Sequence, residues 1–324
     1  MKLVIIILFT VLNLPLLHGQ NKQDSLLVNK LFNSGIEFYE EADYYFIYPE
    51  DYDLYDDEEL EEEKRLREKY LFLSREKFSE IVKNHMNSHL YPKSLYNVAV
   101  IEEELGNIGD AKYLYKKILE SDFDEMESGG VGGGIMGDPY ALFKHNSAKR
   151  LAELSLETKD YKKALKYISL TEKYPYAHTS GNRIASNQII VAKIYAKSYI
   201  GLNEIDRALY KTMPLVIESG LANNRQLVDL SIELLQTKYS VNQLKSELLK
   251  AKNEIFQQDS IDEIHFTSFY TKYFDYILPI PHRMDISDSS TWIEEHNTTE
   301  EIFETYKYLF ENSTFFKLIS ELDE

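Results

Sequence analysis

Three pairs of alanines constrain the fold of this chain more than any other feature of its sequence. The members of each pair lie twelve residues apart, and each pair flanks a short polar connector with apolar residues at helical spacing on both sides. The pairs are Ala99 and Ala111, Ala152 and Ala164, and Ala196 and Ala208. Small residues at such positions let two antiparallel helices approach closely. The sequence therefore predicts an all-α fold in which one helix–turn–helix unit is repeated three times.

The repeated unit resembles the tetratricopeptide repeat (TPR), a helical hairpin of about 34 residues. The alanines stand at the family's small-residue positions, and Tyr115 and Tyr199 stand at aromatic positions. Glu102, Ser155 and Thr212 depart from the pattern, because the family has aromatics there. The first two units are 53 residues apart and the last two 44, so insertions separate them. The resemblance implies a TPR-like α-α superhelical solenoid in an exported bacterial protein.

We expect the helical array to cover residues 20–258, with an acidic insertion at 40–63 and a glycine-rich linker at 125–139. A first helix should place Gly35 near a close helix crossing. Asp138-Pro139 is a typical cap and first turn for the next helix after the linker, and Pro214 should kink or shorten the last helix of the third unit.

The C-terminal part of the chain differs in character. Residues 223–256 predict a fourth, weaker helix pair, in which Ser240 and Gln243 form a capping box. Residues 264–281 are rich in aromatic and β-branched side chains, which favours short strands. Because a solenoid must cover the apolar face of its last unit, we expect residues 259–324 to form a small cap that contains short strands and two helices. A separate small binding module is the alternative.

The N-terminus has the pattern of a secretory signal peptide. Lys2 precedes an apolar run from Leu3 to Leu17, and Gly19 offers a cleavage site, so residues 1–19 are the predicted signal. An uncleaved anchor is the alternative. We expect an exported protein that is periplasmic, secreted or envelope-associated, with no membrane insertion after cleavage. The absence of cysteine excludes disulfides, thiolate chemistry and a lipid-modified N-terminal cysteine.

Charge and motifs exclude several classes of function. A net charge of −18 argues against nucleic-acid binding and against docking on anionic lipid. The acidic insertion, residues 40–63, is most simply a mobile loop, with calcium binding as a weaker alternative. His85 and His89 lack the intervening glutamate of a metalloprotease helix. No catalytic constellation is found, so we expect no enzyme activity, no cofactor and no metal.

The TPR resemblance implies a concave groove lined by the first helix of each unit. It would take Lys93, Tyr96, Val100, Glu103 and Glu104 from the first unit, Asn146, Lys149, Glu153, Leu156 and Glu157 from the second, and Ile190, Lys193, Lys197 and Ile200 from the third. The carboxylate clamp of the chaperone-binding members is not assembled, because Glu153 and Ile194 replace residues that it needs. The predicted contacts with a partner are Tyr96, Asn146, Lys149, Lys193 and Lys197.

These observations lead to a hypothesis with two alternatives. The first choice is a non-enzymatic exported scaffold that binds a protein or peptide in its groove. It is also possible to interpret the chain as an envelope structural or assembly component that acts through its C-terminal cap. A third interpretation is carbohydrate binding by exposed aromatics within Phe266–Tyr276. The sequence specifies neither the partner nor the oligomeric state.

Overall fold

The structure is a computed structural model, and it describes residues 24–48, 55–127, 139–218, 221–258, 268–281 and 299–323. The described part is mostly helical, with one small antiparallel sheet near the C-terminus, which confirms the predominantly helical class. The chain divides into two compact units, residues 1–147 and 148–324. The predicted signal peptide lies outside the described residues.

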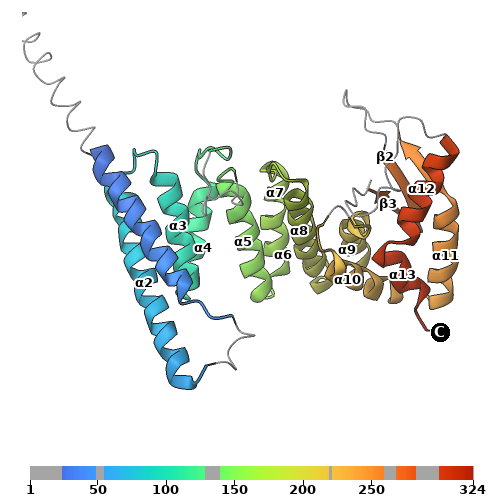
Figure 1. Ribbon diagram of the computed structural model, residues 1–324, viewed down its shortest axis with the longest axis horizontal. Coiled ribbons are helices and arrows are strands. Elements are labelled where there is room, and N and C mark those ends of the chain that lie inside the picture. Colours follow the sequence, from blue (N-terminus) through green and yellow to red (C-terminus); the bar gives the residue numbers. More distant parts are fainter. Residues whose placement is uncertain are drawn as a thin grey trace, which may run out of the picture. The chain divides into compact units, whose positions relative to one another are not determined.

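Unit 1 is built from two helical hairpins (Figure 1). The first joins a helix over residues 24–44 to α2 (Asp57–Asn84), and the second joins α3 (Tyr91–Glu104) to α4 (Ile108–Leu119). α2 contacts α3, and the buried residues between the hairpins include Leu71, Phe78, Val98 and Ile101. Gly35 lies at the expected close crossing, because a Cβ at this position would come within 2.7 Å of the Phe78 ring.

The acidic insertion is less irregular than the sequence predicted. Asp57–Glu63, expected in a mobile loop, forms the first turns of α2. The Asp56 carboxylate accepts hydrogen bonds from the amides of Glu58 and Glu59 at 3.0 and 2.9 Å, and the Glu59 side chain accepts from the Asp56 amide. Carboxylates are also stabilised by the positive end of the helix dipole. The loop prediction was wrong here because it weighed only the repulsion between the charges.

Unit 2 begins within α5 and contains the remaining helices and the sheet. Its elements are α5 (Phe143–Glu157), α6 (Tyr161–Ile168), α7 (Leu170–Lys173), α8 (Gly181–Gly201), α9 (Ile205–Thr212), the 3-10 turn η2 (Met213–Leu215), α10 (Arg225–Gln236), α11 (Val241–Asn253), β1 (Ile255–Gln258), β2 (Ser268–Tyr273), β3 (Tyr276–Ile280), α12 (Thr299–Glu311) and α13 (Thr314–Ser320). The capping box at Ser240 is confirmed. So is the effect of Pro214, since α9 stops two residues before it.

The three predicted hairpins are α3–α4, α5–α6 and α8–α9, and their six alanines are all fully buried. Each turn has one residue in the left-handed region, five positions before the second alanine: Gly106 (φ 76°), Lys159 (φ 57°) and Asn203 (φ 60°). The same two backbone hydrogen bonds close each turn. The amide of that residue donates to the carbonyl three positions earlier, and the next amide donates to the carbonyl five positions before it. Dissimilar sequences thus share one turn geometry, which confirms a repeated hairpin.

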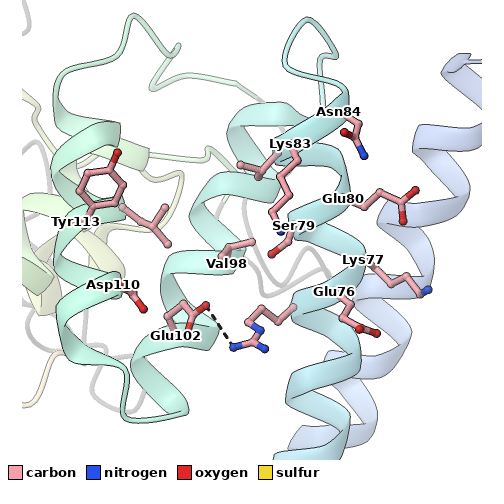
Figure 2. A pocket seen from close by; sticks show the side chains of 13 residues that line it. Glu76, Lys77, Ser79, Glu80, Lys83, Asn84, Val98, Glu102, Asp110 and Tyr113 are labelled. Atoms are coloured by element: carbon pink, nitrogen blue, oxygen red, sulfur yellow. Dashed lines mark ion pairs between the residues drawn. The ribbon is translucent and has the colours of Figure 1, made fainter.

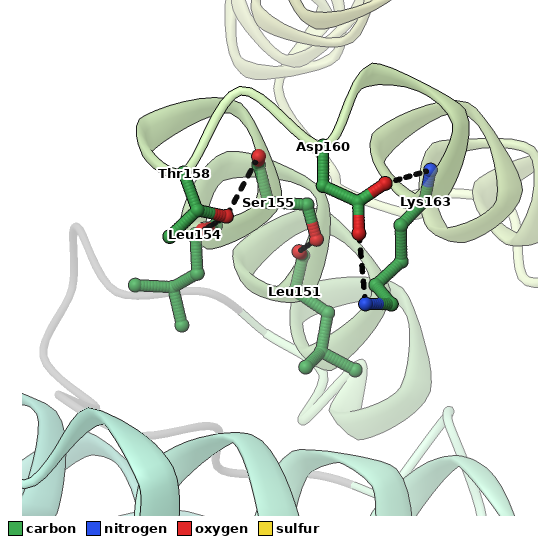
Figure 3. Close-up of polar contacts among 6 residues, drawn as sticks. All are labelled: Leu151, Leu154, Ser155, Thr158, Asp160 and Lys163. Atoms are coloured by element: carbon green, nitrogen blue, oxygen red, sulfur yellow. Dashed lines mark hydrogen bonds and ion pairs between the residues drawn. The ribbon is translucent and has the colours of Figure 1, made fainter.

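Figure 3 shows how side chains reinforce the turn between α5 and α6. The Asp160 carboxylate accepts from the Lys163 amide at 3.2 Å and pairs with the Lys163 ammonium at 2.8 Å. Ser155, which replaces a TPR aromatic, is buried and donates to the Leu151 carbonyl at 2.6 Å. The buried hydroxyl of Ser155 is therefore satisfied.

The start of α5 differs from the prediction. The helix begins at Phe143, four residues later than expected, and its cap is Glu125, the first residue of the predicted linker. The Glu125 carboxylate accepts from the amides of Lys144 and His145 at 2.7 and 3.0 Å. Burial nevertheless raises the pKa of Glu125 above its ordinary value. The rest of the predicted linker, residues 128–138, lies outside the described residues.

The sheet has the order β1-β2-β3, and both strand pairs are antiparallel. The expected strands are confirmed, but β1 starts at Ile255, before the boundary assigned to the cap. α11 contacts β2 and also α13, so the sheet and the last helices pack on the final helix of the array. Thr271 donates to the Ala251 carbonyl of α11 at 2.5 Å, which fixes β2 against that helix.

Candidate functional site

A groove of about 780 Å³ lies in unit 2 between α5 and α8. We call it the α5–α8 groove. Its lining is Arg150, Glu153, Leu156 and Glu157 from α5, Tyr161 from α6, and Ile190, Lys193, Ile194, Lys197, Ile200 and Gly201 from α8. Seven of these residues are groove positions inferred from the TPR resemblance. The structure therefore places these seven predicted residues around one groove within unit 2.

One stripe of α8 forms most of the groove wall. Ile190, Lys193, Lys197 and Ile200 follow one another at intervals of three or four residues, and Ile194 lies next to Lys193, so all five lie on one side of the helix. The stripe spans about 15 Å, at 1.5 Å per residue. Ile190 is 41% exposed and so can be contacted by a partner. The wall thus offers apolar contact and positive charge alternately along its length.

The two lysines of this stripe carry charge that the fold does not neutralise. Within the described part of the chain, neither Lys193 nor Lys197 forms an ion pair. The Lys193 ammonium donates to the neutral amide of Gln226 at 2.5 Å, and Lys197 is exposed. Like charges four residues apart on a helix destabilise it by a few tenths of a kcal/mol. On a chain of net charge −18, the groove lining holds three basic side chains (Arg150, Lys193, Lys197) and two acidic ones (Glu153, Glu157).

One end of the groove is shaped by a close contact. The ring of Tyr161 lies so near Gly201 that an added Cβ would come within 2.4 Å of it. Glycine at this position therefore lets the aromatic ring cover the end of α8. Opposite, Arg150 and Glu153 form an ion pair on α5. Sequence reasoning missed Arg150, Tyr161 and Gly201, because a helix end and an i, i+3 ion pair have no distinctive sequence signal.

Lys149 has a structural partner. Its ammonium donates to the Asn187 side-chain oxygen at 3.2 Å, and Asn187 is buried on α8. The contact joins α5 to α8 beside the groove, but Lys149 is not part of its lining. The structure thus brings Lys193 and Lys197 together and gives Lys149 a role in holding the two helices.

The two residues of unit 1 that were predicted to contact a partner, Tyr96 and Asn146, instead contact other residues of unit 1. The Tyr96 ring packs between Tyr115 and Phe143, with centroid distances of 6.1 and 5.9 Å. The Asn146 amide donates to the Ala141 carbonyl at 3.4 Å. Neither observation supports a role in recognition.

Glu103 and Glu104, the acidic residues of α3 that were predicted to line the groove, form hydrogen bonds within unit 1 instead. The Tyr115 hydroxyl donates to Glu103 at 3.0 Å. Glu104 accepts from the Tyr39 hydroxyl and the Arg67 guanidinium, both at 2.5 Å, and so ties three helices together. Burial, followed by the Glu104 charge, raises the pKa of Tyr39 above its usual range.

Unit 1 also has a hollow of about 750 Å³ formed by α2, α3 and α4 (Figure 2). Its side chains are of mixed charge, with Glu76, Lys77, Glu80 and Lys83 alternating along α2. Arg75 pairs with Glu102 at 3.5 Å across the hollow. Because the opposite charges lie next to each other, this hollow favours no particular ligand.

The carbohydrate interpretation needs exposed aromatics. Phe269, Tyr273 and Tyr276 are buried, so the expectation is wrong for these three residues. Tyr270 and Phe274 are partly exposed, and their rings stack on neighbouring aromatics. Phe266 lies outside the described residues.

Two further searches cover only the described residues. They contain no group of three or more His, Cys, Asp or Glu side chains placed to hold a metal ion. None of their helices has both the length and the apolar character needed to cross a bilayer.

Comparisons with family models, with curated proteins and with solved structures give no match. The TPR resemblance therefore depends on the residues and on the repeated hairpin alone.

Proposed function

We propose that this chain is a non-enzymatic, exported scaffold of TPR-like architecture, and that its α5–α8 groove binds a peptide segment of a partner protein. The architecture is supported by the three hairpins with buried alanine pairs and one shared turn geometry. Export is supported only by the apolar N-terminal segment of the sequence.

The observation that carries the proposal is the alternation of isoleucine and unneutralised lysine along one wall of the groove. An apolar side chain of a partner would cover Ile190, and a carboxylate would be attracted to Lys193 and Lys197. The segment that fits best is therefore one with apolar residues and at least one acidic group. Attraction in such an open groove is weakened by salt, since exposed charges are screened over about 10 Å at 0.1 M.

The test is co-purification of the tagged full-length chain from the envelope fraction of its host at low salt. Lys193→Ala with Lys197→Ala should weaken binding of the recovered partner about tenfold, as expected for two partly exposed charge contacts. The matched control is Lys162→Ala with Lys166→Ala, two exposed lysines at the same spacing on α6. Unchanged affinity in the groove variant, or equal loss in the control, would count against the groove.

A further inference from the structure

The first hairpin of unit 1 extends beyond the second. α2 has 28 residues and α3 has 14, which corresponds to about 42 and 21 Å of helix. Glu104, the last residue of α3, meets α2 at Arg67. Residues 40–48 and 55–66 therefore continue past the end of α3, as Figure 1 shows for α2. We call these residues the arm.

Large aromatic side chains of the arm are exposed. Tyr44 is 81% exposed and Tyr48 58%, and Phe46 and Tyr55 are also exposed. The rings are arranged in ordered pairs. Tyr44 lies edge-on to Tyr45 at a centroid distance of 5.2 Å, and Phe46 lies edge-on to Tyr48 at 5.1 Å. Tyr44 and Tyr48 thus keep more than half of their surface exposed.

The surroundings of the rings select the chemistry of an occupant. The arm carries ten carboxylates and only two basic side chains. Both basic side chains, Lys64 and Arg65, already pair with Glu61 and Glu62. A neutral or acidic segment would gain nothing from these carboxylates, whereas a cationic segment would be attracted to them and to the ring faces.

The arm and its base already show this contact within the chain. The guanidinium of Arg67 lies 4.8 Å from the centre of the Phe46 ring. The ammonium of Lys69 lies 5.3 Å from the centre of the Tyr70 ring, on which Tyr45 stacks. Phe46 of the arm thus accepts a cation, and its exposed partner Tyr48 offers the same kind of ring to solvent, as does Tyr44.

We propose that the arm is a docking surface for an arginine- or lysine-rich segment of another protein. Carboxylates attract the segment, and the exposed tyrosine rings hold its cationic groups by cation–π contact. This surface is separate from the α5–α8 groove and does not depend on it. Arginine should be preferred over lysine, because its planar guanidinium stacks on aromatic rings.

The experiment uses the full chain and labelled peptides that alternate glycine with arginine, lysine or glutamate, with binding followed by fluorescence anisotropy. Tyr44→Ser with Tyr48→Ser keeps the net charge unchanged. Loss of two exposed cation–π contacts should weaken binding of the arginine peptide about five- to thirtyfold. The matched control is Tyr113→Ser with Tyr308→Ser, two tyrosines exposed elsewhere on helices. Circular dichroism checks that all variants keep their helix content.

Three results would overturn the proposal. A change of less than twofold in the arm variant would mean that net charge alone attracts the peptide. An equal loss in the control variant would mean that the tyrosines of the arm have no special role. Binding of the glutamate peptide at least as tightly as the arginine peptide would show that the surface takes another class of ligand.

Discussion

Gly35 offers the sharpest stability test of the helix packing in unit 1. A Cβ at this position would lie 2.7 Å from two ring carbons of Phe78, about 1 Å closer than an ordinary contact. Phe78 is fully buried and packs edge-on against Phe32 at a centroid distance of 5.4 Å, so its ring cannot move aside easily. The Ser74 hydroxyl also donates to the Gly35 carbonyl at 2.7 Å. Gly35→Ala should therefore strain both contacts.

The expected loss of stability in Gly35→Ala is the balance of opposing effects. Overpacking costs about 1–3 kcal/mol, and weakening the buried hydrogen bond adds about 1 kcal/mol. Replacing glycine by alanine within a helix returns about 1 kcal/mol. We expect Gly35→Ala to lower the free energy of unfolding by about 1–3 kcal/mol, measured by urea unfolding with circular dichroism at 222 nm.

The control for this variant is Gly109→Ala in α4, where an added Cβ meets nothing within 4 Å. That change should be neutral or should stabilise by up to about 1 kcal/mol. Hydrogen exchange in residues 24–44 assigns the loss to the first hairpin, since the two compact units need not unfold together. If Gly35→Ala is as harmless as Gly109→Ala, the reasoning about this crossing is refuted.

Three further predictions concern turns and caps. Lys159→Gly should stabilise the chain by about 1 kcal/mol in thermal unfolding, because Lys159 is exposed and its φ of 57° favours glycine. Gly106→Ala should destabilise the chain by a similar amount. Stabilisation by both changes would contradict the shared turn geometry. Asp56→Ala should cost about 1 kcal/mol and increase amide exchange in the first turn of α2, and unchanged exchange would argue against the cap. Carbon-13 NMR titration should give Glu125 a pKa above that of an ordinary glutamate, since burial raises it. The stability linked to Glu125 is then full below its ordinary pKa and is lost as pH rises through the raised value, and a pKa below the ordinary value would contradict this sign.

The features that could be predicted from sequence depend on local periodicity. The alanine pairs, the end of α9 before Pro214 and the capping box at Ser240 are each set within a few residues, so the pattern alone identifies them. The wrong or missed features depend on distant partners. The cap of α5 is Glu125, nearly twenty residues earlier in the chain, and no local signal marks such a contact.

In the candidate site, too, contacts between distant residues could not be predicted from the sequence. The TPR resemblance placed Lys193 and Lys197 on one groove-lining face of α8, and both line the α5–α8 groove. It could not tell that Lys149 would bond to Asn187 or that the Tyr96 ring would be used in packing, because both outcomes depend on which helix lies opposite. The carbohydrate alternative assumed exposed aromatics within Phe266–Tyr276, but the strands turn Phe269, Tyr273 and Tyr276 inward.

The central claim, that the α5–α8 groove binds a partner segment, is tested most directly by site-specific photocrosslinking in cells. A benzophenone amino acid replaces Ile190 in the groove or, as a control, Leu249, which is exposed on α11. The account predicts a discrete crosslinked product from position 190 that disappears with Lys193→Ala and Lys197→Ala and is absent from position 249. The same products from both positions, or a product at 190 that is indifferent to the lysines, would contradict it.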